Sequence, residues 1–196
     1  MTIKQVFLIP LIAITFNSCG NDPLPKPKAM LRLEYPEPQY NRVDVKLPFT
    51  FEKNELADKI SNIKLDGINN AYGVNINYSE MKGTIYLTYK EVNATNLDTL
   101  LRDAQNLTQK HTIKADAIES VLYENPKQNV YGMFYEVGGN AASQSQFYVT
   151  DSTSHFLSGS LYFYAKPNYD SIYPAAVYLK NDIKHLMESI EWKTDQ

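Results

Sequence analysis

Apolar and polar residues alternate in several short segments, which is the pattern of strands with one buried face. The alternation is clearest in residues 72–78 and 85–89, and the turn-forming residues between them, 79–83, predict a β-hairpin. Residues 47–51 alternate in the same way, and residues 118–123 form a further candidate strand. The first half of the folded chain is therefore predicted to be rich in strands.

Two other segments place apolar residues three or four positions apart, as on one face of a helix. The first of these carries Leu97, Leu100, Leu101, Ala104 and Leu107. Thr95, with Asp98 three positions later, predicts a capping box at the start of this helix. A second helix is predicted after Pro174, on the stripe formed by Ala176, Leu179, Ile183, Leu186 and Ile190, with Trp192 following as a large apolar anchor.

Three more strand candidates lie between the two helices, at residues 130–137, 145–150 and 156–164. Turn-forming residues separate them, as expected of an antiparallel meander. Strands, a helix, more strands and a closing helix predict an α+β fold in which an antiparallel β-sheet is packed by two main helices.

The first 46 residues differ in composition from the rest. Residues 1–18 combine Lys4 with a short apolar run, which is too short to span a bilayer and has the layout of a signal peptide. Residues 19–46 are proline-rich and are predicted to form a lipidated tether that runs extended, before a single α+β domain at residues 47–196. In the alternative interpretation, residues 30–33 and 43–45 dock on the domain as edge segments.

Cys19 is the only cysteine of the chain and follows the apolar run directly. The sequence Ser18-Cys19-Gly20 resembles a bacterial lipobox, in which the cysteine thiol receives a diacylglyceryl group and becomes the new N-terminus. Phe16 and Asn17 depart from the commonest lipobox residues, and the alternative is an ordinary signal peptide followed by an unpaired cysteine. Acyl chains such as palmitate on Cys19 would attach the protein to membrane lipid without crossing the bilayer.

The composition excludes several kinds of partner. Without Lys4, 18 basic residues face 22 acidic ones and no basic block occurs, so nucleic acid is not an expected partner. A single cysteine supports neither a disulfide framework nor a thiolate metal site. Fifteen tyrosines and eight phenylalanines, against only eight glycines, favour a strand-rich domain because aromatic side chains fit a half-buried pleated surface.

The titratable residues do not form a catalytic pattern. The three histidines lack a metal-ligand spacing and no glycine-rich phosphate loop occurs, so neither a metal nor a cofactor is expected. His155 follows Asp151 and Ser152, the residue types of a hydrolytic triad, but without the strand-turn-helix setting that exposes a serine nucleophile. We therefore expect a turn in which Asp151 and the hydroxyls satisfy local backbone groups, and no enzymatic activity.

Loops between the aromatic strands are the candidate interaction sites, because loops on a rigid sheet often bind partners. The candidate residues are Gly139, Asn140, Asp151, Ser152, His155, Asn168 and Asp170. The alternative is that the small residues among them serve only to form tight turns.

A set of short motifs resembles a known family. The motifs are IYLTYK at 85–90, KH at 110–111, KAD at 114–116, GNAAS at 139–143, QFY at 146–148, TDS at 150–152, HFL at 155–157 and LYF at 161–163. Together with the lipobox and the proline-rich arm, their order resembles the gliding motility lipoprotein GldD of Bacteroidetes over nearly the whole mature chain. Ser158 departs from the family pattern, in which a basic residue is expected near this position.

The resemblance implies a lipoprotein required for gliding motility and for the associated type IX secretion system, with no established enzymatic activity and with other gliding or secretion envelope proteins as partners. Gly20 is not the aspartate associated with retention in the inner membrane, so we expect the periplasmic face of the outer membrane. A rival hypothesis is a glycan- or peptidoglycan-binding or hydrolytic lipoprotein, suggested by the aromatic strands and His155.

Two further expectations come from similarity. The triplets at 151–153 and 170–172 match a short O-glycosylation signal of Bacteroidetes periplasmic proteins, which makes Ser152 and Ser171 possible modification sites. The order of elements, with a helix after a hairpin and a closing helix, is similar to the PsbP/Mog1-like α-β-α sandwich; a shared fold does not fix function.

Overall fold

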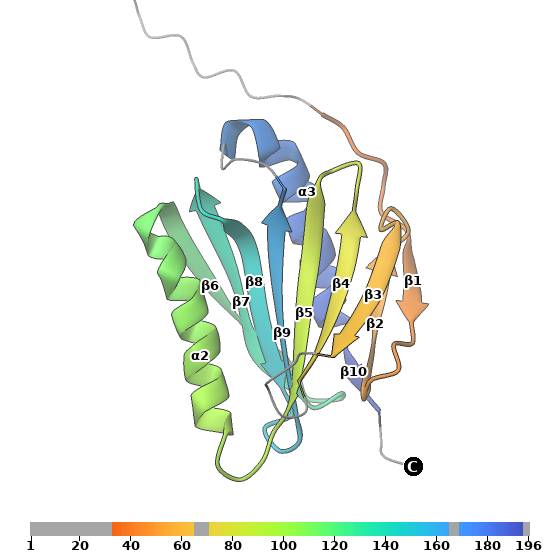
Figure 1. Ribbon diagram of the computed structural model, residues 1–196, viewed down its shortest axis with the longest axis vertical. Helices are drawn as coiled ribbons and strands as arrows, with labels where there is room; N and C mark the ends of the chain where they lie inside the picture. The colour runs from red at the N-terminus through yellow and green to blue at the C-terminus, as the bar shows by residue number, and fades with distance from the viewer. Residues whose placement is uncertain (1–32, 65–70, 165–168, 194–196) are drawn as a thin grey trace, which may run out of the picture.

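A seven-stranded antiparallel sheet forms the centre of the protein (Figure 1). The computed structural model describes residues 33–64, 71–164 and 169–193. In spatial order, the sheet contains β3 (Lys59–Lys64), β4 (Ala71–Tyr78), β5 (Gly83–Glu91), β9 (His155–Phe163), β8 (Ser143–Thr150), β7 (Val130–Gly139) and β6 (Ala115–Asn125). Every pair of neighbours is antiparallel. The predicted hairpin of β4 and β5 and the predicted meander are both present.

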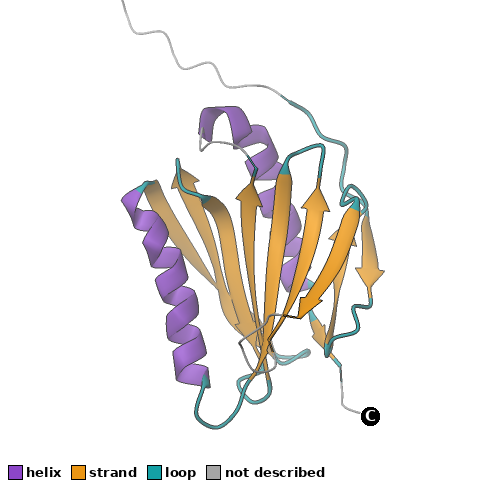
Figure 2. Ribbon diagram, viewed as in Figure 1, coloured by secondary structure: helices purple, strands orange, loops and turns teal. Residues whose placement is uncertain are grey.

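The two helices lie on opposite faces of this sheet (Figures 1 and 2). Helix α2 (Leu97–Gln109) covers part of one face and continues into the short 3₁₀ turn η2 (Lys110–Ile113). Helix α3 (Tyr169–Glu188) covers the other face, where a small sheet of β1 (Tyr40–Val43), β2 (Phe49–Asn54) and β10 (Glu191–Trp192) lies beside it. This arrangement confirms the predicted α+β class.

The main core lies between the large sheet, α3 and β2. Its fully buried members include Phe49, Phe51, Ile85, Leu87, Leu157, Leu161, Leu179, Ile183 and Leu186. Burying one Leu, Ile or Phe side chain contributes about 1.5–3 kcal/mol, so this cluster is the principal source of stability. A smaller cluster of Leu100, Tyr135, Tyr148 and Phe156 joins α2 to the opposite face.

Helix α2 begins one residue later than a capping box at Thr95 requires. Asn96 is the N-cap residue and its side chain makes no cap hydrogen bond to the helix. The side-chain amide nitrogen of Asn96 donates instead to the Glu91 carbonyl at 2.9 Å, and the Thr95 hydroxyl donates to the Asn93 side chain. The predicted capping box is therefore wrong, because these polar groups satisfy the preceding loop.

Helix α3 begins five residues before Pro174, and not after it as predicted. Its first backbone amide, on Tyr169, donates to the side-chain oxygen of Asn140 at 3.0 Å. Helix starts need an acceptor for such amides, and here the acceptor comes from a distant hairpin loop. A tertiary contact therefore extends the helix across a proline that costs one internal hydrogen bond.

The last part of the predicted tether belongs to the folded domain. Strand β1 pairs with β2 from Tyr40 to Val43, and Val45 is buried in the main core. The alternative of a docked edge segment therefore holds for residues 43–45. Residues 30–32 and Cys19 lie outside the described residues.

Candidate functional site

The predicted interaction residues lie at two opposite ends of the sheet. Gly139, Asn140 and Asp170 lie at the end where β7 meets β8 and α3 begins, which is the upper end in Figure 1. Asp151, Ser152 and His155 lie in the β8–β9 turn at the lower end. Asn168 lies outside the described residues. The structure therefore does not bring the predicted residues together into one site.

At the upper end, the two predicted loops are in contact. Asn140 accepts the hydrogen bond from the backbone of Tyr169, which ties the β7–β8 turn to the start of α3. Gly139 has a φ of 86°, and a Cβ atom there would lie 2.7 Å from the backbone nitrogen of Asp116. Glycine is thus required by the turn, in agreement with the alternative that small residues permit tight turns.

At the lower end, Asp151 organises the turn. Its carboxylate accepts hydrogen bonds from the backbone amides of Thr153, Ser154 and His155 at 2.8–3.0 Å. Burial disfavours the charged carboxylate, but the bonds from these amides outweigh it and hold the pKa of Asp151 below its usual value. Asp151 therefore stabilises the turn, as expected from the sequence.

Ser152 and His155 point to different partners. The Nδ1 atom of His155 is 2.9 Å from the Tyr89 hydroxyl, and its ring stacks on Trp192 with centroids 5.0 Å apart. Ser152 is exposed, with a φ of 67°, and its backbone amide donates to the hydroxyl of Thr150. No hydrogen bond joins Ser152 to His155 in the part of the chain that the structure describes. Ser171 is also exposed, in the first turn of α3.

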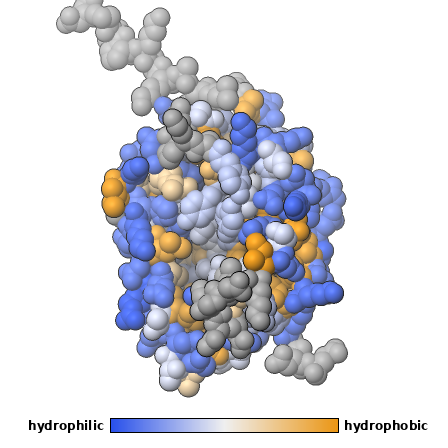
Figure 3. Space-filling view, in the orientation of Figure 1, coloured by the Kyte–Doolittle hydropathy of each residue, from blue (hydrophilic) through white to orange (hydrophobic). Residues whose placement is uncertain are grey.

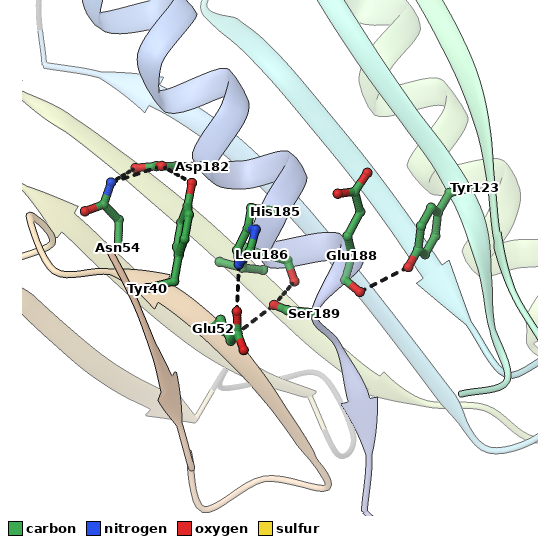
Figure 4. A network of polar contacts seen from close by, with 9 residues as sticks. All are labelled: Tyr40, Glu52, Asn54, Tyr123, Asp182, His185, Leu186, Glu188 and Ser189. Atoms are coloured by element: carbon green, nitrogen blue, oxygen red, sulfur yellow. Dashed lines mark hydrogen bonds and ion pairs between the residues drawn. The ribbon is translucent and has the colours of Figure 1, made fainter. Parts of the chain in front are cut away.

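A buried polar network beneath α3 was not anticipated from the sequence (Figure 4). Asp182 is only 3% exposed and accepts hydrogen bonds from the Asn54 amide at 2.9 and 3.1 Å and from the Tyr40 hydroxyl at 2.9 Å. Burial raises the pKa of Asp182, although these donors partly oppose that effect. Burial and the nearby Asp182 carboxylate likewise raise the pKa of Tyr78 and Tyr40.

The same network attaches the start of the domain to α3. The ring of Tyr40 stacks on His185 with centroids 3.6 Å apart, and His185 contacts the Glu52 carboxylate at 2.7 Å. Four residues before Tyr40, the Pro36 carbonyl accepts a hydrogen bond from the Tyr178 hydroxyl of α3 at 2.9 Å. One sequence signal was available: position 182 falls on the apolar stripe between Leu179 and Leu186, where a carboxylate must be buried.

A groove of about 220 Å³ runs between α2 and the sheet. Hydroxyl, amide and aromatic groups line it, together with Lys90 and Asp103; the uncharged lining residues include Thr88, Thr108, Tyr135, Gln146, Tyr148, Phe156, Ser158 and Ser160. Burial, with smaller effects of Tyr148, raises the pKa of Tyr135 to about 12, so the phenol stays protonated. The groove can bind a small neutral polar group by hydrogen bonds and ring contacts.

At one end of this groove, the Gln146 side chain joins α2 to the sheet. Its oxygen accepts from the Thr108 hydroxyl at 2.7 Å, and its nitrogen lies 2.8 Å from Nε2 of His111. Burial lowers the pKa of His111, so the ring is neutral at pH 7. In the tautomer that carries its proton on Nδ1, the neutral imidazole accepts a hydrogen bond from this amide through Nε2.

The described residues contain neither a cluster of metal-ligating side chains nor a helix that could span a membrane. No group of three or more His, Cys, Asp or Glu side chains in residues 33–64, 71–164 and 169–193 is arranged to hold a metal ion. None of the helices in these ranges is long and apolar enough to cross a membrane.

Comparison with known families decides the identity. The family model described as gliding motility lipoprotein GldD matches residues 20–192. The chain belongs to the GldD family. The match begins directly after Cys19 and ends at the last residue of β10, so it covers every described helix and strand. No curated protein and no solved structure matches the chain, so the similarity to PsbP/Mog1-like proteins stays an expectation.

Membership of the GldD family confirms the resemblance seen in the sequence. The family is one of lipoproteins with a role in gliding motility. A family of lipoproteins implies anchoring to the membrane through lipid.

Proposed function

We propose that this protein is a non-enzymatic lipoprotein of the periplasm that serves gliding motility and type IX protein secretion by binding other envelope proteins. The observation that carries the proposal is the GldD family match, which begins at the residue after Cys19. The contacts of Asp151, Ser152 and His155 support a non-enzymatic role. Asp151 and the backbone of Ser152 bond locally at the β8–β9 turn, and the His155 ring bonds the Tyr89 hydroxyl on β5.

Acylated Cys19 is the proposed anchor, with palmitate among its acyl chains and the periplasmic face of the outer membrane as its location. Several acyl chains on one cysteine give lasting attachment, whereas a single chain binds only marginally. Location at the outer membrane is supported by Gly20, which is not the aspartate associated with retention in the inner membrane.

The open edge of the large sheet supports a role in protein contacts. Strand β6 has eleven residues and, among the described strands, pairs only with β7. Its other edge therefore presents backbone groups that can pair with an added strand. Val121 and Leu122 on this strand are 56% and 64% exposed. Asp116, Glu119 and Glu124 are its charged residues, which favours a partner strand with basic side chains.

Deletion of the gene tests the proposal as a whole. We expect the deletion strain to lose both colony spreading and secretion through the type IX system, and the wild-type gene to restore both. Secretion at the wild-type level in the deletion strain would contradict the proposed role in export.

Substitution of Leu122 by Lys tests the β6 contact. A charge at this edge should block strand pairing, so spreading and secretion should fall while the amount of membrane-bound protein stays the same. Ile63→Lys is the matched control, because Ile63 is an exposed apolar residue on β3 at the opposite edge. Equal behaviour of the two variants would argue against β6 as the contact.

A glycan- or peptidoglycan-binding lipoprotein is the second candidate, and the groove beneath α2 favours it. Purified protein should then sediment with isolated peptidoglycan. Ser158→Trp, which fills the groove, should abolish sedimentation, while Ser61→Trp on the uncovered part of the same face should not. Normal motility of the Ser152→Ala, His155→Ala double variant would argue against hydrolysis at the β8–β9 turn.

A further inference from the structure

A small apolar surface lies at the upper end of α2. Leu107, Ile113, Ala141 and Ala142 line a shallow hollow there, and Lys110, Lys114 and His111 border it. Ile113 is 86% exposed, the highest value among the large hydrophobic residues of the described ranges. Figure 3 shows hydrophobic atoms at the left edge of the molecule, over this end of α2. We call Leu107, Lys110, Ile113 and Lys114 the α2-end surface.

Buried contacts hold this surface in one orientation. Thr108 and His111 turn inward and contact Gln146 on β8, at 2.7 and 2.8 Å. Thr108 and His111 face the sheet, whereas Lys110 and Ile113 of η2 and the following Lys114 are exposed to solvent. Ile113 is therefore presented to solvent between two lysines, beside the apolar side chains of Leu107, Ala141 and Ala142.

The charge of the surface is positive, although the chain as a whole has a net charge of −3. Neither Lys110 nor Lys114 takes part in the ion pairs formed within the described ranges. Asp116 is the neighbouring acid, at the start of β6. Lysines beside an exposed apolar residue match the anionic headgroups and the acyl boundary of a membrane.

The chain that leads to the proposed anchor enters at this same end of the molecule. The described chain begins at Leu33. Its first segment, orange in Figure 1, enters above the sheet at the upper end of the molecule, the end at which α2 finishes and the β7–β8 turn lies. Only residues 20–32 separate it from Cys19. Thirteen residues span at most about 45 Å when fully extended, so acylation of Cys19 would keep this end within reach of the bilayer.

We propose that the α2-end surface rests on the anionic surface of the membrane that holds Cys19, with Ile113 inserted among the lipids and Lys110 and Lys114 bound to their headgroups. The proposal rests on the proposed acylation of Cys19. A tether gives the surface an effective concentration of about a millimolar at the membrane, so a weak contact is sufficient. The β8–β9 turn at the opposite end would then point away from the membrane.

The single cysteine allows a direct test in vitro. Mature protein, residues 19–196, is coupled through the thiol of Cys19 to vesicles that contain a maleimide lipid, which reproduces the tether without the cell's acylation pathway. Trp replaces Ile113, and the vesicles carry phosphatidylglycerol and a doxyl-labelled lipid that quenches tryptophan fluorescence. The wild-type protein supplies the baseline, because its only tryptophan, Trp192, lies at the opposite end.

We expect at least twofold stronger quenching of Trp at position 113 than at position 122, where Leu122→Trp is the matched exposed control on β6. Replacing phosphatidylglycerol by phosphatidylcholine, or both Lys110 and Lys114 by Glu, should remove the difference. Equal quenching of the two tryptophans, or none, would overturn the proposal. Self-association of the protein that Ile113→Ser abolishes, measured by sedimentation without vesicles, would also overturn it and assign the surface to a second copy.

Failure of this test leaves the proposed function intact, because gliding and secretion are measured in cells. Conversely, a deletion strain that glides and secretes normally would refute the proposed function without affecting the contact with vesicles.

Discussion

At the scale of single residues, Asp182 is the only charged residue among the buried side chains of the described ranges. A buried carboxylate is disfavoured unless hydrogen-bond donors surround it, and Asn54 and Tyr40 supply them. Both donors come from β1 and β2, more than 120 residues earlier in the chain. The cost of burying this carboxylate is therefore offset by contacts that also attach the first two strands to α3.

Substitution of Asp182 by Asn should change the pH dependence of stability. The pKa of Asp182 is raised in the fold, so its contribution to stability is largest below the pKa of the unfolded chain and is lost as the pH rises through the folded pKa. The free energy of unfolding of Asp182→Asn, relative to that of the wild type, should therefore increase between pH 4 and pH 7. Urea denaturation at several pH values measures this; a relative stability that falls with pH would show the opposite shift.

At the scale of elements, β1 connects the tether to the domain through few contacts. It has four residues, pairs with no described strand other than β2, and is fixed to α3 mainly by Tyr40. The ion pair of Arg42 with Glu191 adds a contact to β10. A short edge strand of this kind is a candidate for local opening, because it buries little apolar surface.

Tyr40→Ala should release β1 while the large sheet stays folded. Loss of the stacked ring and of the hydrogen bond to Asp182 should lower stability by about 1–3 kcal/mol. Trypsin should then cleave after Arg42 faster than in the wild type, while cleavage within the large sheet is unchanged. Asn41→Ala, on the exposed side of the same strand, is the control, and equal cleavage of the two variants would contradict the role of Tyr40.

Close packing between strands decides which glycines can be replaced. A Cβ atom on Gly132 of β7 would lie 1.9 Å from the backbone oxygen of Tyr148 on β8, so the strands would have to separate. We expect Gly132→Ala to lower the free energy of unfolding by about 1–3 kcal/mol or more. Gly138→Ala, whose nearest atom is 3.8 Å away, should lie within about 0.5 kcal/mol of the wild type. Thermal unfolding of both variants tests the difference.

At the scale of the whole molecule, the proposed acylation of Cys19 gives the fold one end near the membrane and one end far from it. The first described segment, the β7–β8 turn and the α2-end surface lie at the first, and the β8–β9 turn and β10 lie at the second. The open edge β6 connects the two ends, so a partner strand bound there would run along the length of the domain.

Cys19→Ala tests attachment at this scale. Without acyl chains the protein should move from the membrane fraction to the soluble fraction and lose labelling with palmitate, because the α2-end surface alone gives only weak binding. The triple variant Cys19→Ala, Lys110→Glu, Lys114→Glu should be recovered in the soluble fraction at least as completely as Cys19→Ala alone. Membrane recovery of Cys19→Ala at the wild-type level, together with continued labelling by palmitate, would refute lipidation at this cysteine.

The sequence by itself determined several of the elements and the turn at Asp151. Alternation in 72–78 and 85–89 identified the β4–β5 hairpin, and the stripe from Leu97 to Leu107 identified α2, because these patterns depend only on which face of an element is buried. The role of Asp151 was also predictable, since the backbone amides that donate to its carboxylate lie within four residues of it in the sequence. The motif order identified the family for the same reason, as it is a property of the chain alone.

Only the tertiary structure decided which distant segments meet. Three features depend on contacts between residues far apart in sequence. They are the placement of β9 between β5 and β8, the start of α3 at Tyr169, whose amide donates to the Asn140 side chain, and the burial of Asp182. Local periodicity carries no information about such contacts, because packing of both sheet faces fixes strand order and orientation together. The same packing placed the predicted loops at opposite ends and left Ile113 exposed between two lysines.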